Sequence, residues 1–365
     1  MAKVLEGSAE IKLGNNTFYN TKMKGLRDLS VLFLNAMELK RYSLLDSTAA
    51  TGIRGIRYRL EAGAGEITLL DINKKAFGSI KANLKANRVK ASAINKSIQE
   101  FCNTEDRSFD VIDLDPFGTA APYIYDLMKV AHDKTVLMVT CTDTAVLCGA
   151  NPLACYKTYG SMPMHNELCH EAGTRILLNF IAKIASQFNF GIEVRLAIAN
   201  LHYIRVFLTL KHGAAEAVES VRKTGFASFC SKCRSYTYAM GLAPKLERKC
   251  KNCGTETFAF GPMWLGGIYD DRLIREMMKI APKEMDSEAL KLLKKIDSEL
   301  DIPFFYSVPK LTRQLRIGAV SHIKVIEKLK KKYLASETHF DLNGVKTDAP
   351  TSQVLKCVME SLVAT

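Results

Sequence analysis

A carboxylate, a proline and an aromatic ring follow one another where a strand of this chain is expected to end. The segment Phe109–Gly118 starts as a buried strand, which Pro116 stops because proline fixes φ and cannot extend a ladder. The Asp115 carboxylate and a main-chain carbonyl near Pro116 would accept N–H bonds from the exocyclic amino group of a nucleobase. Phe117 would stack on that base once it is flipped out. Asp113, on the same strand face, either supports this catalytic site or is solvated.

A turn of small residues precedes this segment. The strand Tyr42–Leu45 runs into a turn that contains Gly52 and Gly55, where the backbone and a helix N-terminus would approach a ligand. Asp71 ends the next strand, at a distance suited to the ribose of a nucleoside cofactor. The glycine spacing is not that of a dinucleotide site, so S-adenosyl-L-methionine fits better. The alternatives are an ordinary strand–helix turn and a helix N-cap at Asp71.

Four of the ten cysteines form two pairs with the spacing of metal ligands. Cys230 and Cys233 make one pair, Cys250 and Cys253 the other, and sixteen residues separate the pairs. Four thiolates suit a tetrahedral structural zinc and leave no position open for catalysis. An iron–sulfur cluster and chance remain as alternatives. Basic residues around the pairs are either a nucleic-acid contact or a solvated loop. Four others lack ligand spacing and are interpreted as core residues: Cys141, Cys148, Cys155 and Cys169.

Short apolar runs alternate with helical stretches through the first part of the chain, which predicts an α/β fold with a mostly parallel sheet. Two domains follow from the length and the change of pattern, residues 1–212 and residues 213–365. We expect a smaller, mixed α+β second domain that carries the cysteines, and a loop over Asp341–Pro350. The expected strands are Tyr42–Leu45, Glu66–Leu70, Phe109–Leu114, Thr135–Val139, Ile192–Ala199 and Ile204–Leu210, the last two antiparallel. The expected helices are Lys74–Asn87, Ala121–His132, Glu167–Gln187, Ala214–Thr224, Arg272–Ile280, Ser287–Leu300 and Ala319–Leu334.

The net charge of +13 is shared almost equally, +6 in the first predicted domain and +7 in the second. Positive charge on both parts favours a polyanionic partner such as nucleic acid over a merely basic protein. A mean hydropathy of −0.02 and the absence of a long apolar run argue against a membrane protein. The N-terminus has no apolar segment of a signal peptide and no twin arginine, which argues against secretion. No obligate protein partner is evident.

With these residues described, the chain resembles the tRNA (guanine-26-N2) dimethyltransferase family nearly from end to end. The resemblance lies in EGSAEI, FYNTKMKGLRDLSV, ATGIRGIRY, IDLDPFG, CTDTAVLCGA, the four cysteines, FGPMWLGG and THFDLNGVKTDAP. It implies a class I (Rossmann-like) methyltransferase domain and a tRNA-contacting C-terminal domain. It also implies two successive methyl transfers from S-adenosyl-L-methionine to N2 of guanine 26 of tRNA, and a cytoplasmic enzyme.

The resemblance also assigns cofactor-binding residues. Arg27 and Arg54 would contact the cofactor, with Asp71 on its ribose. Where family members commonly carry an acidic residue at the adenine, this chain has Ser97 and Ile98, and the side chain of nearby Asn95 is an alternative. Two other functions remain open from the residues alone. One is an adenine-N6 methyltransferase, and the other is a nucleic-acid-binding zinc protein without catalysis.

Overall fold

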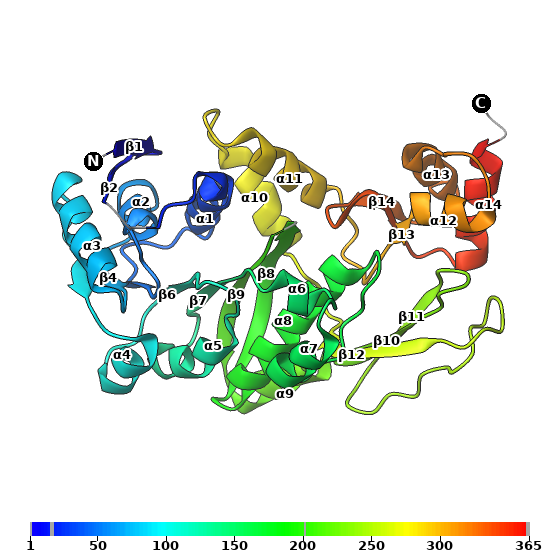
Figure 1. Ribbon diagram of the computed structural model, residues 1–365, viewed down its shortest axis with the longest axis horizontal. Helices are drawn as coiled ribbons and strands as arrows, with labels where there is room; N and C mark the ends of the chain where they lie inside the picture. Colours follow the sequence, from blue (N-terminus) through cyan, green and yellow to red (C-terminus); the bar gives the residue numbers. More distant parts are fainter. Residues whose placement is uncertain (1, 15–17, 201, 363–365) are drawn as a thin grey trace.

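A seven-stranded sheet forms the centre of the protein, whose computed structural model describes residues 2–14, 18–200 and 202–362 (Figure 1). Its strand order is β5-β4-β3-β6-β7-β9-β8. The chain therefore enters the sheet at β3, adds β4 and β5 toward one edge, and then adds β6 to β9 toward the other edge. All six predicted strands are present. The strands are β3 (Leu44–Asp46), β4 (Ile67–Leu70), β5 (Ser92–Ile94), β6 (Val111–Leu114), β7 (Val136–Cys141), β8 (Phe190–Asn200) and β9 (Tyr203–His212).

The sheet is parallel except at one edge. Strands β3 to β7 run parallel, whereas β9 pairs antiparallel with both β7 and β8, as predicted. β8 ends at Asn200 and β9 begins at Tyr203, which leaves no room for a crossover helix. The central strands are buried along their whole length, and this explains why they read as continuous apolar runs rather than alternating ones.

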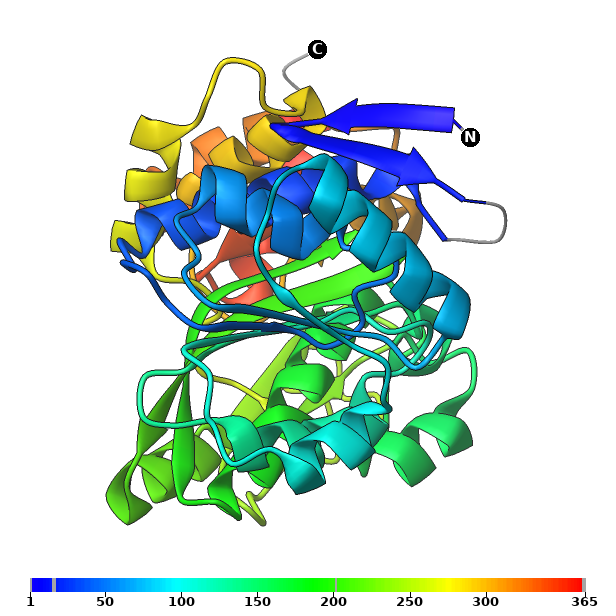
Figure 2. The same cartoon turned by 90° about the vertical axis from the view of Figure 1, so that its left-hand side faces the viewer.

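Helices cover both faces of this sheet, as Figure 2 shows with the sheet seen nearly edge-on. Helices α1, α2, α3 and α10 lie on one face, and α4, α5 and α8 on the other. The predicted helix Ala121–His132 is shorter, because α5 passes into a 3₁₀ turn and stops at Val130. The helices of this part are α1 (Lys24–Ala36), α2 (Ile53–Glu61), α3 (Lys74–Ala86), α4 (Ile98–Thr104), α5 (Ala121–Leu127), α6 (Thr144–Leu147), α7 (Pro152–Tyr159) and α8 (Cys169–Ser186).

The remaining chain builds two three-stranded antiparallel sheets and further helices. One sheet has the order β11-β10-β12 and the other β13-β15-β14. The loop predicted over Asp341–Pro350 was wrong: most of it is β15, whose backbone pairs with both neighbours and whose Val345 is fully buried. The turn-forming residues that suggested a loop occupy only its first half. The strands are β10 (Thr224–Phe229), β11 (Tyr236–Met240), β12 (Phe258–Trp264), β13 (Tyr306–Ser307), β14 (Ala335–Thr338) and β15 (Asp341–Thr347).

The largest apolar core continues past the predicted boundary at residue 212. It joins the central sheet to β10, β12, α10 and α11. A second, smaller core lies among the elements from β13 to α14. Helices α10 and α11 pack on α1, where the Asp286 amide donates to Asp28 Oδ2 at 3.0 Å. The division at 212 stays a prediction. The other elements are β1 (Ala2–Glu6), β2 (Ala9–Leu13), α9 (Ala214–Arg222), α10 (Asp271–Ile280), α11 (Ser287–Asp297), α12 (Val308–Leu315), α13 (His322–Leu329) and α14 (Thr351–Leu362).

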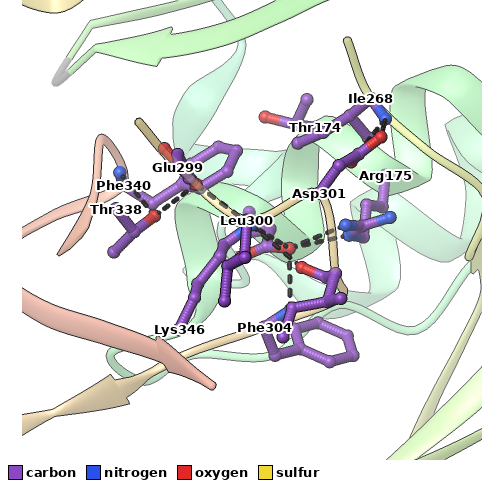
Figure 3. Close-up of polar contacts among 12 residues, drawn as sticks. Thr174, Arg175, Ile268, Glu299, Leu300, Asp301, Phe304, Thr338, Phe340 and Lys346 are labelled. Atoms are coloured by element: carbon purple, nitrogen blue, oxygen red, sulfur yellow. Dashed lines mark hydrogen bonds and ion pairs between the residues drawn. The ribbon is translucent and has the colours of Figure 1, made fainter. Parts of the chain in front are cut away.

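A buried ion network connects α8 to β15 and to the segment after α11 (Figure 3). The Lys346 ammonium lies 3.5 Å from Glu171 and 3.0 Å from Glu299, with all three side chains fully buried. Arg175 pairs with Glu171 at 2.8 Å, and the His339 ring with Glu299 at 2.7 Å. Buried charges of this kind persist only when each has a partner, so the network fixes how these elements sit on α8.

The network predicts an acid-sensitive stability. Burial alone would raise the pKa of Glu299, but the charges of His339 and Lys346 outweigh burial and hold that pKa well below its ordinary range. A lowered native pKa gives stability that is complete above the unfolded pKa of about 4.3 and is lost as the pH falls toward the native value. The Glu299→Gln variant lacks this titration, so its deficit in unfolding free energy should shrink below that pH by up to about 1.4 kcal/mol per pH unit.

Urea denaturation of both proteins between pH 7 and pH 3 measures this effect. Glu288→Gln is the matched control, because the Glu288 side chain is 78% exposed, and its curve should run parallel to that of the unaltered protein. A constant gap between Glu299→Gln and the unaltered protein down to pH 3 would contradict the prediction.

Candidate active site

A cavity of about 630 Å³ opens at the carboxyl ends of the central parallel strands. Open α/β sheets bind ligands at this edge. Two predicted site residues lie outside the lining: Gly52 shapes the turn beneath it, and Asp113 is buried behind it. The predicted residues that line the cavity are Arg27, Arg54, Asp71, Ser97, Ile98, Asp115, Pro116 and Phe117.

The turn after β3 and the end of β4 are held together by Asp71. Its Oδ2 accepts the Ala50 amide at 2.9 Å, and its Oδ1 accepts the Asn73 amide at 2.8 Å. Asn73, not Asp71, is the N-cap of α3, so the N-cap alternative is wrong. Gly52 has φ of +81°, a left-handed conformation that favours glycine. The turn therefore keeps its shape, and each Asp71 oxygen retains a lone pair for a hydroxyl donor.

The Asp115–Gly118 loop is fastened to the strands on both sides of β6. The Asp115 amide donates to Thr48 Oγ1 at 2.9 Å, and the Gly118 amide donates to Thr142 Oγ1 at 2.8 Å. Gly118 has φ of +74°, which again favours glycine. The Asp115 side chain is 24% exposed and reaches the cavity, so its carboxylate is accessible to a ligand.

The Arg54 guanidinium binds one oxygen of the Asp115 carboxylate, Oδ2. It also donates to Asp46 Oδ1 at 2.9 Å and to the Thr48 carbonyl oxygen at 2.6 Å. Among the described residues, no hydrogen bond uses Asp115 Oδ1. Arg54 thus orients this carboxylate and leaves one oxygen to accept a new donor.

Asp113 is fully buried, so the interpretation that it is solvated was wrong. Tyr58 donates to its Oδ2 at 2.6 Å, and Arg205 donates to the same oxygen at 3.1 Å. Burial alone would raise the pKa of Asp113, but the charges of Arg205 and Arg54 outweigh it and lower the pKa. Asp113 therefore stays ionised and holds Arg54 in place. No motif or spacing in the sequence distinguishes Tyr58 or Arg205 as a partner of Asp113.

The adenine-side positions also have defined partners. Ser97 is the N-cap of α4, and its hydroxyl accepts the Glu100 amide at 3.0 Å. The Asn95 side chain instead donates to the Asp71 carbonyl oxygen at 2.8 Å and does not line the cavity. Ser97 and Ile98, rather than Asn95, therefore face the ligand space. Arg27 is held by Glu6 at 2.6 Å while its side chain reaches the lining.

A second ring, Phe18, which no sequence motif singled out, pairs with the predicted Phe117 at the mouth of the cavity. Phe18 and Phe117 meet edge to face with ring centroids 4.7 Å apart, and both line the cavity. Phe117 is 77% exposed and Phe18 is 54% exposed, so both rings are accessible to a ligand. Exposed rings beside a carboxylate offer a stacking surface for a base. Phe18 lies about one hundred residues before Phe117 in the sequence, and only the fold brings them together.

The four predicted metal-binding cysteines form one cluster. The sulfur atoms of Cys230 and Cys253 are 3.5 Å apart, those of Cys233 and Cys250 are 3.3 Å apart, and all four lie within 4.8 Å of one another. A tetrahedral zinc with bonds of about 2.3 Å holds its sulfurs about 3.8 Å apart, so this donor set fits a metal.

Comparison with known proteins gives the family. The family model described as "N2,N2-dimethylguanosine tRNA methyltransferase" matches residues 2–359. The chain belongs to this family. A tRNA (guanine(26)-N(2))-dimethyltransferase from Pyrococcus horikoshii is 38% identical over 96% of this chain and 94% of its own length. One from Methanothermobacter thermautotrophicus is 34% identical over 97% of each chain.

A solved structure extends the similarity to the fold. Trm1 from Pyrococcus horikoshii, in complex with S-adenosyl-L-methionine, has a TM-score of 0.90 and 35% identity over 98% of this chain and 99% of its own. The match favours the N2-dimethylguanosine methyltransferase family over the adenine enzyme and over the zinc protein without catalysis. Within the described residues, no helix is long and apolar enough to cross a membrane.

Proposed function

We propose that this chain is an S-adenosyl-L-methionine-dependent tRNA methyltransferase that adds one and then a second methyl group to N2 of guanine 26. The observation that carries this proposal is the single cavity that joins Asp71, suited to a ribose, to Asp115 and Phe117, suited to an amino-bearing base. Family membership supports the substrate. The products are N2-methylguanosine and N2,N2-dimethylguanosine.

Some residues of the cavity would bind the cofactor, and others would act on the base. S-adenosyl-L-methionine, when bound, supplies an electrophilic methyl group. Asp71, Ser97, Ile98, Arg27 and Arg54 would hold it at the ends of β4, β5 and β3. The guanine N2 is a poor nucleophile, because its lone pair is conjugated with the ring. Asp115 Oδ1 and a main-chain carbonyl near Pro116 would accept the N–H bonds of this amino group, favour a pyramidal nitrogen and stabilise the positive charge that develops there. Each transfer releases one N–H proton, which the Asp115 carboxylate would accept, and leaves S-adenosyl-L-homocysteine.

The rest of the chain is assigned by the same proposal. Residues 1–212 form a class I methyltransferase domain, which the strand order with its antiparallel β9 supports. Residues 213–365 form the tRNA-contacting part, in which the four cysteines hold a structural zinc. The net charge of +13 favours binding of the tRNA backbone. A tRNA substrate supports a cytoplasmic location.

Nucleoside analysis of a defined substrate tests the proposal. The purified full chain is incubated with S-adenosyl-L-methionine and an unmodified tRNA transcript, and the digested RNA is examined by mass spectrometry. We expect N2-methyl- and N2,N2-dimethylguanosine, both absent when the transcript carries adenine at position 26. Methylation of another base would overturn the substrate, and modification that persists without guanine 26 would overturn the position.

The aromatic pair predicts a loss of substrate binding. Stacking on a base contributes about 1–3 kcal/mol per aromatic ring, so Phe18→Ala and Phe117→Ala should each lower kcat/KM for tRNA about 5- to 150-fold. Steady-state kinetics with the same transcript measure this change. Tyr125→Ala on α5 is the control, because Tyr125 is 47% exposed but lies outside the cavity lining. An unchanged kcat/KM in both phenylalanine variants would refute a stacking role.

A further inference from the structure

A second cluster of metal-binding side chains lies away from the cavity lining and from the four cysteines. The ligand atoms of Cys148, Cys169 and His170 all lie within 4.8 Å of one another. Cys148 directly follows α6, whereas Cys169 and His170 are the first two residues of α8. Among the described residues, only this cluster and the four cysteines gather three or more side chains in this way. The spacing along the chain gives no motif, so the sequence analysis interpreted these cysteines as core residues.

One distance within this cluster matches that between two ligands of a shared metal. Zinc bonds of about 2.3 Å to sulfur and about 2.0–2.1 Å to nitrogen, at a tetrahedral angle, place the two donor atoms about 3.6 Å apart. Cys148 Sγ and His170 Nδ1 are 3.6 Å apart. A weak hydrogen bond also has this length, and the Cys148 and Cys169 thiols make a second one. A metal is therefore indicated by the three donor atoms that converge within 4.8 Å, the same limit that the four-cysteine cluster meets.

The loops that present these ligands are fixed in position. His165 Nδ1 is 3.1 Å from the Cys148 carbonyl oxygen, and the Cys169 amide donates to the Asn166 carbonyl oxygen at 3.1 Å. Gly149 approaches the chain so closely that a Cβ there would lie 2.9 Å from the Met164 carbonyl carbon. Contacts within the protein therefore hold the three side chains close together before a metal binds. Cys169 and His170 are only half-buried, so an ion has a route from solvent.

We propose that Cys148, Cys169 and His170 bind a second divalent cation of the zinc class, with solvent in the fourth position. Two thiolates and an imidazole form a donor set that suits such an ion and excludes magnesium and calcium, which prefer oxygen. None of the three residues lines the cavity, so the ion lies outside the methyl-transfer site although its fourth position is open to solvent. It would tie the segment that begins at Thr142, in the cavity wall, to the start of α8.

Metal stoichiometry tests this site independently of methyl transfer. The full chain is purified under reducing conditions, equilibrated with Zn²⁺, freed of excess ion by gel filtration and analysed for metal. We expect two zinc ions per chain in the unaltered protein and one in Cys169→Ser and in His170→Gln. The double variant Cys250→Ser/Cys253→Ser should also hold one, and Cys102→Ser, a buried cysteine of α4 outside both clusters, should hold two.

Cobalt substitution supplies a second measurement, which begins with the unaltered protein. The unaltered protein should show two sets of thiolate-to-cobalt absorption bands, and His170→Gln should remove only one of them. A single zinc ion in the unaltered protein, lost only with Cys250 and Cys253, would overturn the proposal. A Cys148–Cys169 disulfide in the native protein, detected by non-reducing peptide mapping, would also overturn it and make the pair a redox site.

Discussion

The Asp115→Ala enzyme should turn over at least two orders of magnitude more slowly than the unaltered one while it binds S-adenosyl-L-methionine almost as well. Removal of one group that stabilises charge in a transition state costs about 10²- to 10³-fold in kcat. Here that group is a carboxylate that also accepts the amino N–H of the base. Arg54 keeps its bonds to Asp46 and Thr48, so the fold behind Asp115 should survive.

Two measurements on the same preparation separate catalysis from binding. Single-turnover transfer to the tRNA transcript gives the rate, and calorimetry gives the affinity for S-adenosyl-L-methionine. Asp106→Ala is the matched control, because Asp106 is exposed on the surface just before the same strand. A wild-type rate in Asp115→Ala would refute the proposed mechanism. An equal loss of rate and of cofactor affinity would assign Asp115 to binding instead.

The Lys346→Met protein should lose about 3–5 kcal/mol of unfolding free energy, the range for breaking a buried ion pair by removing one partner. Lys346 lies between Glu171 and Glu299, both fully buried, and it also donates to the Ile302 carbonyl oxygen at 3.0 Å. Methionine keeps most of the volume but leaves the two carboxylates with one cation fewer. The lost stability should therefore reflect charge rather than a cavity.

Urea denaturation measures the total change, and hydrogen exchange shows where it falls. Protection should decrease most in β15 and in the first turns of α8. Lys356→Met on α14 is the control, because Lys356 is 61% exposed and its pair with Glu360 should contribute less than about 1 kcal/mol. Equal stabilities of the two variants would show that the buried network contributes no more than a surface pair.

The sequence predicted the parts of the site that are encoded locally. Asp71 and Asp115 each stand where a strand stops, and Pro116 marks such an end without reference to the rest of the chain. Their positions in one cavity follow because parallel strands share an edge. The order of the strands could not be predicted, because it depends on which apolar runs pair. These runs are similar in length and composition.

The other features depend on contacts between distant segments. Phe18 has no local pattern that distinguishes it from a surface phenylalanine, and Arg205 resembles any charged residue in a strand although it is buried against Asp113. Strand β15 replaces the expected loop, although its Asn343 and Gly344 favour turns. Pairing with β13 and β14 outweighed that preference.

Helix α1 has a consequence for how the protein is made. Ten of its thirteen residues are buried, and much of that cover comes from α10 and α11. A ribosome releases α1 early, whereas α10 begins only at Asp271. The nascent chain must therefore carry an uncovered apolar helix until most of the protein has been synthesised, which is a condition that invites aggregation or chaperone binding. A fragment that ends at residue 212 lacks α10 and α11, so the face of α1 that they cover would stay exposed.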